Sequence, residues 1–449
     1  MHQMPAQAGR VVNGHGEALT RTASDETVLP RQGTEDAGRG LLAQVLAREN
    51  MQRAWKRVKA NKGAGGVDGL DIAQTGAHLK HAWPSIRQQL LDGTYRPQPV
   101  RRVGIPKADG SERELGIPTV TDRLIQQALL QVLQPLIDPT FSEHSYGFRP
   151  GRRARDAVLA AQRYAQQGYH IVVDVDLSKF FDRVNHDILI DRLRKRVNDA
   201  GIIRLVRAYL NAGILDGGVV IERVNGTPQG GPLSPLLANV LLDEVDRELE
   251  RRGHCFARYA DDCNVYVRSQ KAGERVMRLL RRCYDKLHLK INESKSAVAS
   301  VFGREFLGYA LWQAGNGEVR RAVSEQALGA FRRRVRQLTR RNGGRSMVEV
   351  VERLRSYLLG WKGYFGLAQT PGVWRRLDEW IRRRLRALQL KQWRRGKTIY
   401  RELLRIGASP RVAQSVAALS RRWWHNSLSA VHHVLTIAYF DRLGVPRLS

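Results

Sequence analysis

The sequence has few cysteines and no long hydrophobic run. Its three cysteines, Cys255, Cys263 and Cys283, form no CxxC pair, which excludes a disulfide framework and a zinc knuckle and predicts free thiols. No apolar run approaches the roughly 18 residues of a membrane-spanning helix, and the N-terminus lacks the apolar core of a signal peptide. We therefore expect a cytoplasmic protein without a membrane partner.

Acidic residues are also scarce relative to basic ones. The 449 residues include 75 Lys and Arg against 43 Asp and Glu, which gives a net charge of +32. With 42% hydrophobic residues, the chain is long enough for roughly two to four domains with real cores, so it is globular rather than a disordered polycation. Nucleic acid is the commonest large partner for such a charge.

Strands and helices interleave over roughly residues 96–320, which predicts an α+β region. A β-hairpin is expected around Asp109 and Gly110, with Lys107 and Arg113 on its two arms. An amphipathic helix follows, and its apolar stripe is expected to be Leu124, Ala128, Val132 and Leu136.

The segments on either side of this region have different patterns. Residues 1–40 lack apolar periodicity and predict a flexible leader. Beyond about residue 324 the strand signals fade, and arginines accumulate in helical patterns. Five arginines mostly avoid the apolar stripe of the predicted helix over 373–390, which indicates a basic face: Arg375, Arg376, Arg382, Arg383 and Arg386.

Two adjacent carboxylates, Asp261 and Asp262, stand in "ARYADDCNVYV" within this basic chain. On a strand they would point to opposite faces, but on the turn of a hairpin both can reach one spot. Converging carboxylates repel each other, and a divalent cation such as Mg²⁺ relieves that repulsion. Taken alone, the pair is more often a polar turn, because Asp is a common turn residue.

A third carboxylate is expected from "VVDVDLSKFFD". Asp174 and Asp176 lie two residues apart and so on one strand face, and periodicity alone does not choose between them. One such acid and the two of a neighbouring hairpin would hold two metal ions about 3.5–4 Å apart, as in phosphoryl transfer. The pattern therefore indicates phosphodiester chemistry.

The series "DLSKFFD", "GTPQGGPLSPLLANVLLDEVD", "YADD" and "FLGY" resembles the ordered motifs of reverse transcriptases, in spellings similar to those of group II intron-encoded reverse transcriptase/maturases. Two upstream segments, "IPKADGSERELGIPTVTDRLIQQAL" and "FSEHSYGFRPGR", are similar to the fingers motifs of that family. "YLLGWKGYFGLAQTPGVWRRLDEWIRRRLR" is similar to its maturase, or thumb, domain. The resemblance covers about residues 41–449.

The resemblance implies roles for single residues. It selects Asp176, with Asp261 and Asp262, as the catalytic and metal-binding set for two Mg²⁺ ions, with Mn²⁺ as a substitute, and leaves Asp174 structural. The implied nucleotide-binding residues are Lys107, Arg113, Phe181, Gln229, Gly230 and Lys295. Phe181 would select deoxynucleotides, and Lys295 would assist the pyrophosphate leaving group. From the residues alone, Lys107 and Arg113 are more often solvated charges than ligands. For Lys295, a structural role and a role in the active site are equally expected.

The resemblance also implies a right-hand polymerase fold. The expected parts are a leader (1–40), fingers (41–165), a palm (166–320), a helical thumb/maturase domain (321–400) and a basic nucleic-acid-binding segment (401–449), with a reverse transcriptase domain over about 96–320. No endonuclease-type cluster of cysteines and histidines precedes Ser449, so we expect the protein not to nick a DNA strand. We expect it instead to prime from an existing DNA 3′ end.

The implied function is an RNA-directed DNA polymerase that also assists the splicing and mobility of its parent group II intron. Its partners would be that intron RNA, an RNA template with a DNA primer, target DNA and dNTPs, in the bacterial cytosol and at the nucleoid. Two alternatives stay open. One is an RNA-binding splicing cofactor in which polymerisation is secondary, and the other is a reverse transcriptase of a retron or phage-defence lineage.

Overall fold

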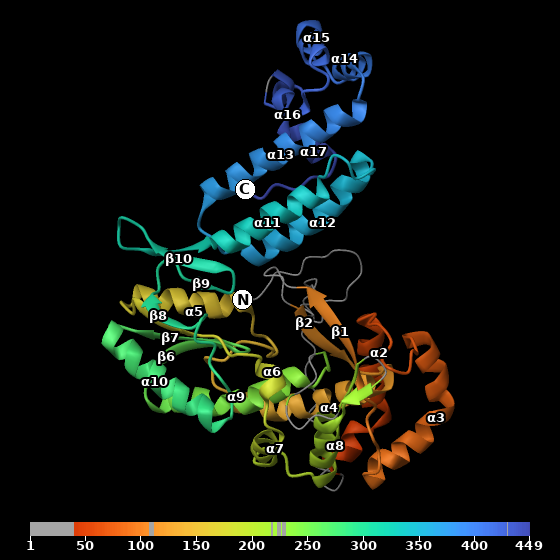
Figure 1. Ribbon diagram of the computed structural model, residues 1–449, viewed down its shortest axis with the longest axis vertical. Helices are drawn as coiled ribbons and strands as arrows, with labels where there is room; N and C mark the ends of the chain where they lie inside the picture. Colours follow the sequence, from red (N-terminus) through yellow and green to blue (C-terminus); the bar gives the residue numbers. More distant parts are fainter. Residues whose placement is uncertain (1–39, 107–111, 217–218, 222–225, 227–229, 429) are drawn as a thin grey trace, which may run out of the picture. The chain divides into compact units, whose positions relative to one another are not determined.

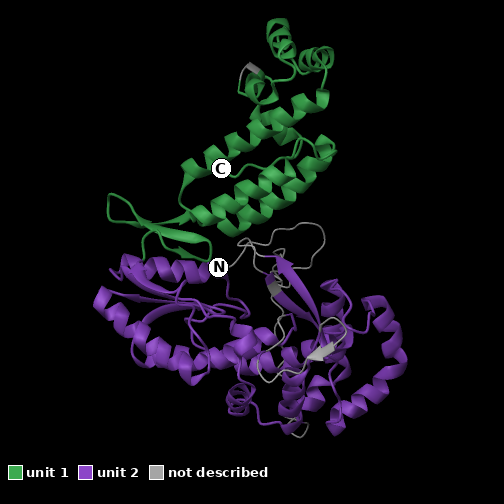
Figure 2. Cartoon of the chain, viewed as in Figure 1, with its two compact units in different colours: residues 1–9, 301–449 green, residues 10–300 purple. Residues whose placement is uncertain are grey.

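The computed structural model describes residues 40–106, 112–216, 219–221, 226, 230–428 and 430–449. The predicted leader, apart from Gly40, lies outside these residues. The described chain forms two compact units, one of residues 40–300 and one of residues 301–449 (Figure 2).

The unit of residues 40–300 mixes helices and strands, which confirms the predicted α+β class (Figure 1). Its helices are α1 (Leu41–Val45), α2 (Arg48–Ala60), α3 (Ile72–Asp92), α4 (Val120–Ile137), the 3-10 helix η1 (Asp138–Thr140), α5 (Ala154–Gln166), α6 (Phe180–Arg183), α7 (His186–Arg194), α8 (Ala200–Asn211), α9 (Ser234–Arg251) and α10 (Gln270–Lys286). Its strands are β1 (Val100–Pro106), β2 (Glu112–Ile117), β3 (Ile171–Val175), β4 (Ile214–Asp216), β5 (Val219–Ile221), β6 (Cys255–Tyr259), β7 (Asp262–Val267) and β8 (Ala297–Ser300).

A four-stranded sheet with the order β6-β7-β3-β8 lies in the core of this unit. All of its neighbouring strands are antiparallel. Helix α10 packs against β3, β7 and β8, and α5 packs against β6 and β7 from the other side (Figure 1). Both faces are therefore covered, which explains why β-branched residues such as Val172, Val173 and Val265 are buried on both faces.

The two arms of the predicted hairpin are β1 and β2, whereas its turn residues Asp109 and Gly110 lie outside the described residues. The two strands pair antiparallel, from Arg101 opposite Ile117 to Pro106 opposite Glu112. Strand β1 also pairs in parallel with β4, so that a second sheet has the order β2-β1-β4-β5.

The predicted apolar stripe of α4 is only partly correct. Leu124 and Ala128 are buried, but Val132 is half-buried and Leu136 is 49% exposed. The stripe that stays buried along the whole helix is offset by one residue and consists of Ile125, Leu129, Leu133 and Ile137. Helices α1, α2 and α3 pack against α4, and this packing selects between the two stripes.

The unit of residues 301–449 begins with a three-stranded sheet and continues with helices. Its strands, in the order β11-β10-β9, are β9 (Glu305–Phe306), β10 (Tyr309–Gln313) and β11 (Val319–Val323). Its helices are α11 (Glu325–Leu338), α12 (Met347–Phe365), α13 (Pro371–Trp393), α14 (Gly396–Arg405), α15 (Pro410–Ala418), α16 (Trp423–Asn426), the 3-10 helix η2 (Ala430–His433) and α17 (Ile437–Arg442).

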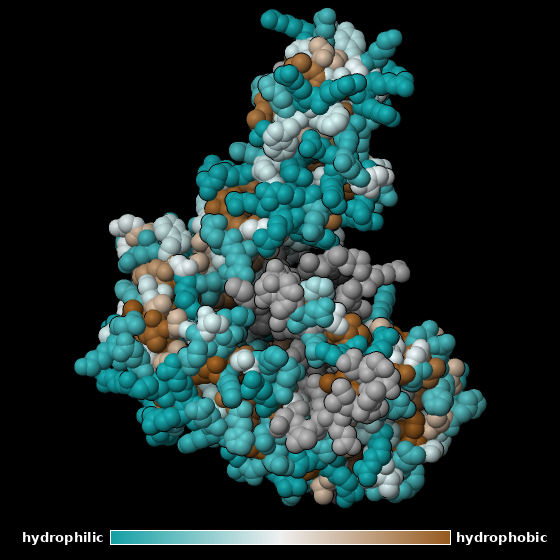
Figure 3. Space-filling model, in the orientation of Figure 1, coloured by the Kyte–Doolittle hydropathy of each residue, from teal (hydrophilic) through white to brown (hydrophobic). Residues whose placement is uncertain are grey.

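Aromatic side chains pack at the centre of this second unit. The Trp361 ring centroid lies 4.2 Å from that of Phe331, 4.8 Å from that of Phe365 and 5.3 Å from that of Trp374. Hydrophilic side chains cover most of the face of both units visible in Figure 3. Within the described chain, no helix combines the length and the apolar character needed to cross a bilayer.

The predicted basic face of α13 is correct for Arg375 and Arg376, which are exposed, but wrong for Arg382. The Arg382 side chain is fully buried and forms ion pairs with Asp378 (2.9 Å) and Asp441 (3.1 Å). A guanidinium neutralised in this way is part of the core rather than of a surface for a polyanion.

Candidate active site

Asp261 and Asp262 lie at the hairpin turn between β6 and β7, as predicted. Tyr259 pairs with Asp262, so Ala260 and Asp261 form a two-residue turn. Ala260 has a φ of 58°, a left-handed conformation that is uncommon for a residue with a Cβ atom. Both carboxylates therefore belong to residues at one end of the sheet, on a turn that the surrounding structure must hold.

Strand β3 brings a third carboxylate to that end of the sheet. Val175, the last residue of β3, is the register partner of Cys263 in β7. Asp176 follows Val175 and Asp262 precedes Cys263. The two aspartates therefore lie at the same end of the neighbouring antiparallel strands β3 and β7. The sheet thus gathers Asp176, Asp261 and Asp262, which are far apart in the sequence.

Asp174, the residue that periodicity could not separate from Asp176, lies inside β3. It is the register partner of Asn264 in β7. In the orientation that satisfies both polar atoms of the Asn264 amide, its nitrogen donates to Asp174 Oδ1 at 2.9 Å. A hydrogen bond to a sheet partner agrees with the structural role expected for this residue.

The carboxylates interact electrostatically. Burial, followed by the negative charges of Asp261, Asp176 and Asp174, raises the pKa of Asp262 to about 7. Among the residues that the structure describes, no group of three or more His, Cys, Asp or Glu side chains is arranged to hold a metal ion. The mutual repulsion nevertheless fits the charge of a divalent cation, and oxygen ligands suit Mg²⁺.

Asp176 is contacted by the segment that follows α10. The side-chain nitrogen Nδ2 of Asn292 donates to Asp176 Oδ2 (3.1 Å), and the backbone N–H of Asn292 donates to the backbone carbonyl of Asp176 (2.8 Å). The Asp176 amide donates to Ser296 Oγ (3.0 Å). Lys295 Nζ lies 3.8 Å from Asp176 Oδ2, and the Lys295 side chain is 44% exposed. Neither Asn292 nor Ser296 was predicted, although both lie within three residues of Lys295 in "NESKS".

Phe181 and Gly230 are the other implied nucleotide-binding residues that the structure describes in full. Phe181 is half-buried in α6, with its ring centroid 5.0 Å from that of Phe180. Gly230 has a φ of 134°, and a Cβ atom there would lie 2.7 Å from the carbonyl oxygen of Gly116 in β2. Only glycine fits this close approach to β2.

The remaining implied residues can be located only in part. Arg113 lies in β2, where it pairs with Ile105 of β1, but its side chain is outside the described part of the chain. Lys107 and Gln229 also lie outside the described residues. Their proposed contacts with a nucleotide stay predictions.

Two protein families match the chain. Residues 105–311 match the family described as reverse transcriptase (RNA-dependent DNA polymerase), and residues 328–407 match the group II intron, maturase-specific domain. The first match contains the "YADD" hairpin and the second contains α12 and α13. These matches confirm the prediction of a reverse transcriptase joined to a maturase domain, and the second favours the group II intron lineage over the retron and phage-defence lineages.

Individual proteins are also similar to this chain. Protein YkfC of Escherichia coli K12 is 32% identical over 313 residues, which cover 60% of this chain and 82% of YkfC. The group II intron-encoded protein LtrA of Lactococcus lactis is 39% identical over 195 residues, which cover 43% of this chain and 32% of LtrA. The putative COX1/OXI3 intron 2 protein of Saccharomyces cerevisiae is 30% identical over 200 residues, 44% of this chain and 23% of that protein. The matched segments thus span a third or less of these two intron proteins but most of YkfC. Together with the two family matches, these similarities show that the chain belongs to the group II intron reverse transcriptase/maturase family.

Proposed function

We propose that this chain copies RNA into DNA at Asp176, Asp261 and Asp262, and that it binds its parent group II intron RNA to assist splicing and mobility. The observation that carries the proposal is the convergence of these carboxylates at one end of the β6-β7-β3-β8 sheet, where burial and mutual repulsion raise the pKa of Asp262 to about 7. A chain that only bound RNA would gain nothing from such a cluster, because carboxylates repel phosphates.

The reaction proposed for this site is nucleotidyl transfer. The 3′-hydroxyl of a DNA primer attacks the α-phosphate of a dNTP in line, and pyrophosphate leaves. Two Mg²⁺ ions bound by the three carboxylates, or Mn²⁺ in their place, would compensate the negative charge that develops in this reaction. Lys295, exposed and within 3.8 Å of Asp176 Oδ2, is the side chain suited to meet the departing pyrophosphate.

Phe181 and Gly230 are proposed to shape the nucleotide site. The half-buried ring of Phe181 is held against Phe180 and so offers a fixed bulky surface, which would exclude a ribose 2′-hydroxyl. The close approach of Gly230 to β2 ties the loop before α9 to the strand that contains Arg113. We assign Lys107, Arg113 and Gln229 to contacts with the triphosphate and the nascent base pair.

The proposed architecture is a right hand. Residues 41–165 would form the fingers, 166–320 the palm, 321–400 the thumb/maturase domain and 401–449 a basic segment that contacts target DNA. Support for the nucleic-acid surfaces comes from basic side chains that lie over tryptophan rings in the second unit. The Arg383 guanidinium lies 3.9 Å from the Trp424 ring centroid, and Lys391 Nζ lies 5.3 Å from that of Trp423.

The polymerase proposal is tested by primer extension. Purified protein supplied with an RNA template, a DNA primer, dNTPs and Mg²⁺ should extend the primer, and Asp261→Ala should abolish extension. Asp187→Asn is the matched control, because Asp187 is an exposed acid on α7 that pairs with Arg207. A wild-type chain that binds RNA but extends no primer would leave the splicing-cofactor alternative.

The maturase part of the proposal is tested by RNA binding and splicing. The DNA flanking the gene should encode a group II ribozyme, and the protein should bind that RNA more tightly than an unrelated structured RNA of equal length. The Asp261→Ala chain should still stimulate splicing, because splicing does not use the polymerase carboxylates. Equal binding of both RNAs would contradict a specific maturase role.

A further inference from the structure

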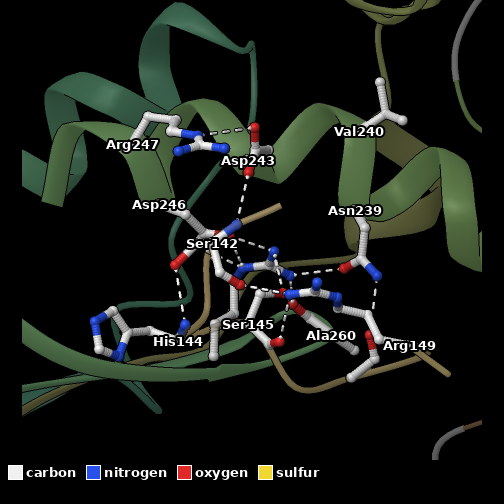
Figure 4. Close-up of polar contacts among 12 residues, drawn as sticks. Ser142, His144, Ser145, Arg149, Asn239, Val240, Asp243, Asp246, Arg247 and Ala260 are labelled. Carbon is white, nitrogen blue, oxygen red and sulfur yellow. Dashed lines mark hydrogen bonds and ion pairs between the residues drawn. The ribbon is translucent and has the colours of Figure 1, made fainter. Parts of the chain in front are cut away.

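Arg258, in the strand β6 that leads into the catalytic turn, has a fully buried side chain. Sequence reasoning did not predict this burial, because arginine is mostly a surface residue. Its ion-pair partner Asp246, in α9, is also fully buried. Figure 4 shows Asp246 and Asn239 on α9, together with Ser145 and Ala260, and all four residues accept hydrogen bonds from this guanidinium. A charged group in such a place requires an explanation, because desolvation makes it costly.

The Arg258 guanidinium has an acceptor for every one of its N–H groups. Nε donates to Asp246 Oδ1 (2.8 Å), and Nη2 donates to Asp246 Oδ2 (2.5 Å) and to Ser145 Oγ (2.8 Å). Nη1 donates to Asn239 Oδ1 (2.9 Å) and to the carbonyl oxygen of Ala260 (2.8 Å). A buried network with complete hydrogen bonding is rigid and holds its members in one arrangement.

The acceptor that matters for the site is the Ala260 carbonyl. This carbonyl belongs to the peptide group that joins Ala260 to Asp261, so its direction sets the orientation of the backbone at Asp261. Ala260 is also the turn residue with the uncommon φ of 58°, which the surrounding structure must hold in place. Arg258 therefore secures the turn from inside the hairpin.

A second contact secures the same turn from outside. Asn239, which accepts from Arg258, also donates through Nδ2 to the carbonyl of Gly147 (2.9 Å). Gly147 lies against the turn so closely that a Cβ atom there would be 2.2 Å from the Ala260 amide nitrogen. The segment before Gly147 runs beside β6, since Tyr146 N donates to the Arg258 carbonyl (2.8 Å). One network thus holds both sides of the turn.

Stability alone does not account for this network. Replacing a buried ion pair by apolar residues of similar volume is often neutral or stabilising, so such a pair is weak evidence for a stabilising role. The distinctive feature here is the bond to the turn that presents two of the three carboxylates.

We propose that Arg258 is a positioning residue for nucleotidyl transfer, and that through the Ala260 carbonyl, Asn239 and Gly147 it holds Asp261 and Asp262 in the geometry that receives divalent cations. This inference rests on the proposed polymerase function.

The test compares Arg258→Lys with wild type. Lysine keeps the positive charge for Asp246, but its single ammonium cannot reach Asp246, Asn239, Ser145 and Ala260 together. The matched control is Arg196→Lys, because Arg196 also pairs with an acid of α9, Asp243 (2.5 Å), and its described hydrogen bonds go to α9 rather than to the turn.

Two readouts separate positioning from a loss of folded protein. The first is the single-turnover rate constant of primer extension, which Arg258→Lys should lower by about 10- to 100-fold, as expected when a residue that orients metal ligands is changed. The second is Mn²⁺ affinity, measured by electron paramagnetic resonance in a complex with a chain-terminated primer and the next dNTP, which should fall by a similar factor. The Kd for primer and template should stay at the wild-type value, and Arg196→Lys should match wild type in all three measurements.

A purely structural role gives a different result. It would lower the fraction of active protein, and hence the amplitude of extension, while the rate constant and the Mn²⁺ affinity stayed at wild-type values; that result would overturn the inference. If Arg258→Lys does not fold, Asn239→Ala takes its place, and wild-type values for the folded Asn239→Ala chain would also overturn it. A wild-type chain that extends no primer refutes the proposed function instead, and the Mn²⁺ comparison still decides whether Arg258 positions the carboxylates.

Discussion

At Asp262, burial and the neighbouring carboxylates oppose ionisation and raise the pKa to about 7. The folded chain therefore keeps a proton at pH values where the unfolded chain, with an ordinary Asp pKa of about 3.9, has released it. Stability then falls as the pH rises from about 4 to about 7, because the folded state binds more protons than the unfolded state over that range. A bound divalent cation removes the cause of this loss.

The first prediction concerns this pH dependence. Without divalent cations, the Tm of the wild-type chain should fall relative to that of Asp262→Asn as the pH rises through this range, since an amide does not ionise. The measurement is thermal unfolding of both chains across a pH series in EDTA. A Tm difference that does not change with pH would contradict the prediction.

For Lys295, the sequence does not decide between a structural role and a role in assisting the leaving group. As a half-exposed ion pair with Asp176, it should contribute little to stability. If it instead assists the pyrophosphate leaving group, Lys295→Ala should lower the single-turnover rate constant by about 10²-fold or more, the typical contribution of a general acid. We expect this loss with an unchanged Tm, and partial recovery in Lys295→Arg. An unchanged rate constant would leave only the structural reading.

At the scale of elements, α4 shows how packing decides what periodicity leaves open. Two rows of apolar residues at four-residue spacing run along this helix, one through Leu129 and one through Leu136. Because one turn holds 3.6 residues, both rows wind slowly around the helix axis and at the same rate. The row through Leu129 stays buried, whereas the row through Leu136 becomes exposed toward the end of the helix. The contacts of α4 with α1, α2 and α3 select the buried row.

This difference gives a prediction for two leucines of one helix. Leu129→Ala should destabilise the chain by about 2–5 kcal/mol, because it removes a fully buried side chain and leaves a cavity. Leu136→Ala, in a residue that is 49% exposed, should change stability by no more than about 0.5 kcal/mol. Urea denaturation of both variants provides the comparison. Equal losses would show that the exposed row also contributes to the core.

At the scale of the whole molecule, the net charge of +32 favours binding to a polyanion, and the match to the group II intron maturase-specific domain implies that this polyanion is RNA. Only some of the arginines are available to it. Arg375 and Arg376 on α13 are exposed and have no ion pair with a described residue, whereas Arg382 on the same helix is buried and neutralised. Fewer arginines are therefore available to a polyanion than the sequence contains.

The last prediction follows from this distinction. Changing Arg375 and Arg376 to Gln should weaken RNA binding and reduce the slope of log Kd against log salt by roughly one for each phosphate that is no longer neutralised. The matched control changes Arg251 and Arg252 to Gln, which removes the same charge from residues already paired with Glu248. Equal effects of the two double variants, measured by filter binding over a salt series, would show that net charge alone governs affinity.

The sequence by itself determined the family, the α+β class and the placement of Asp261 and Asp262 on a hairpin turn. These depend on residues close together in the chain: an ordered series of motifs, alternating apolar residues and an acidic pair between two strands. Only the tertiary structure decided that Arg382 is in the core, that Arg258 holds the turn and that Asn292 contacts Asp176. Asn292 and Asp176 are 116 positions apart in the sequence. No local pattern specifies which distant segments meet when the chain buries its apolar surface.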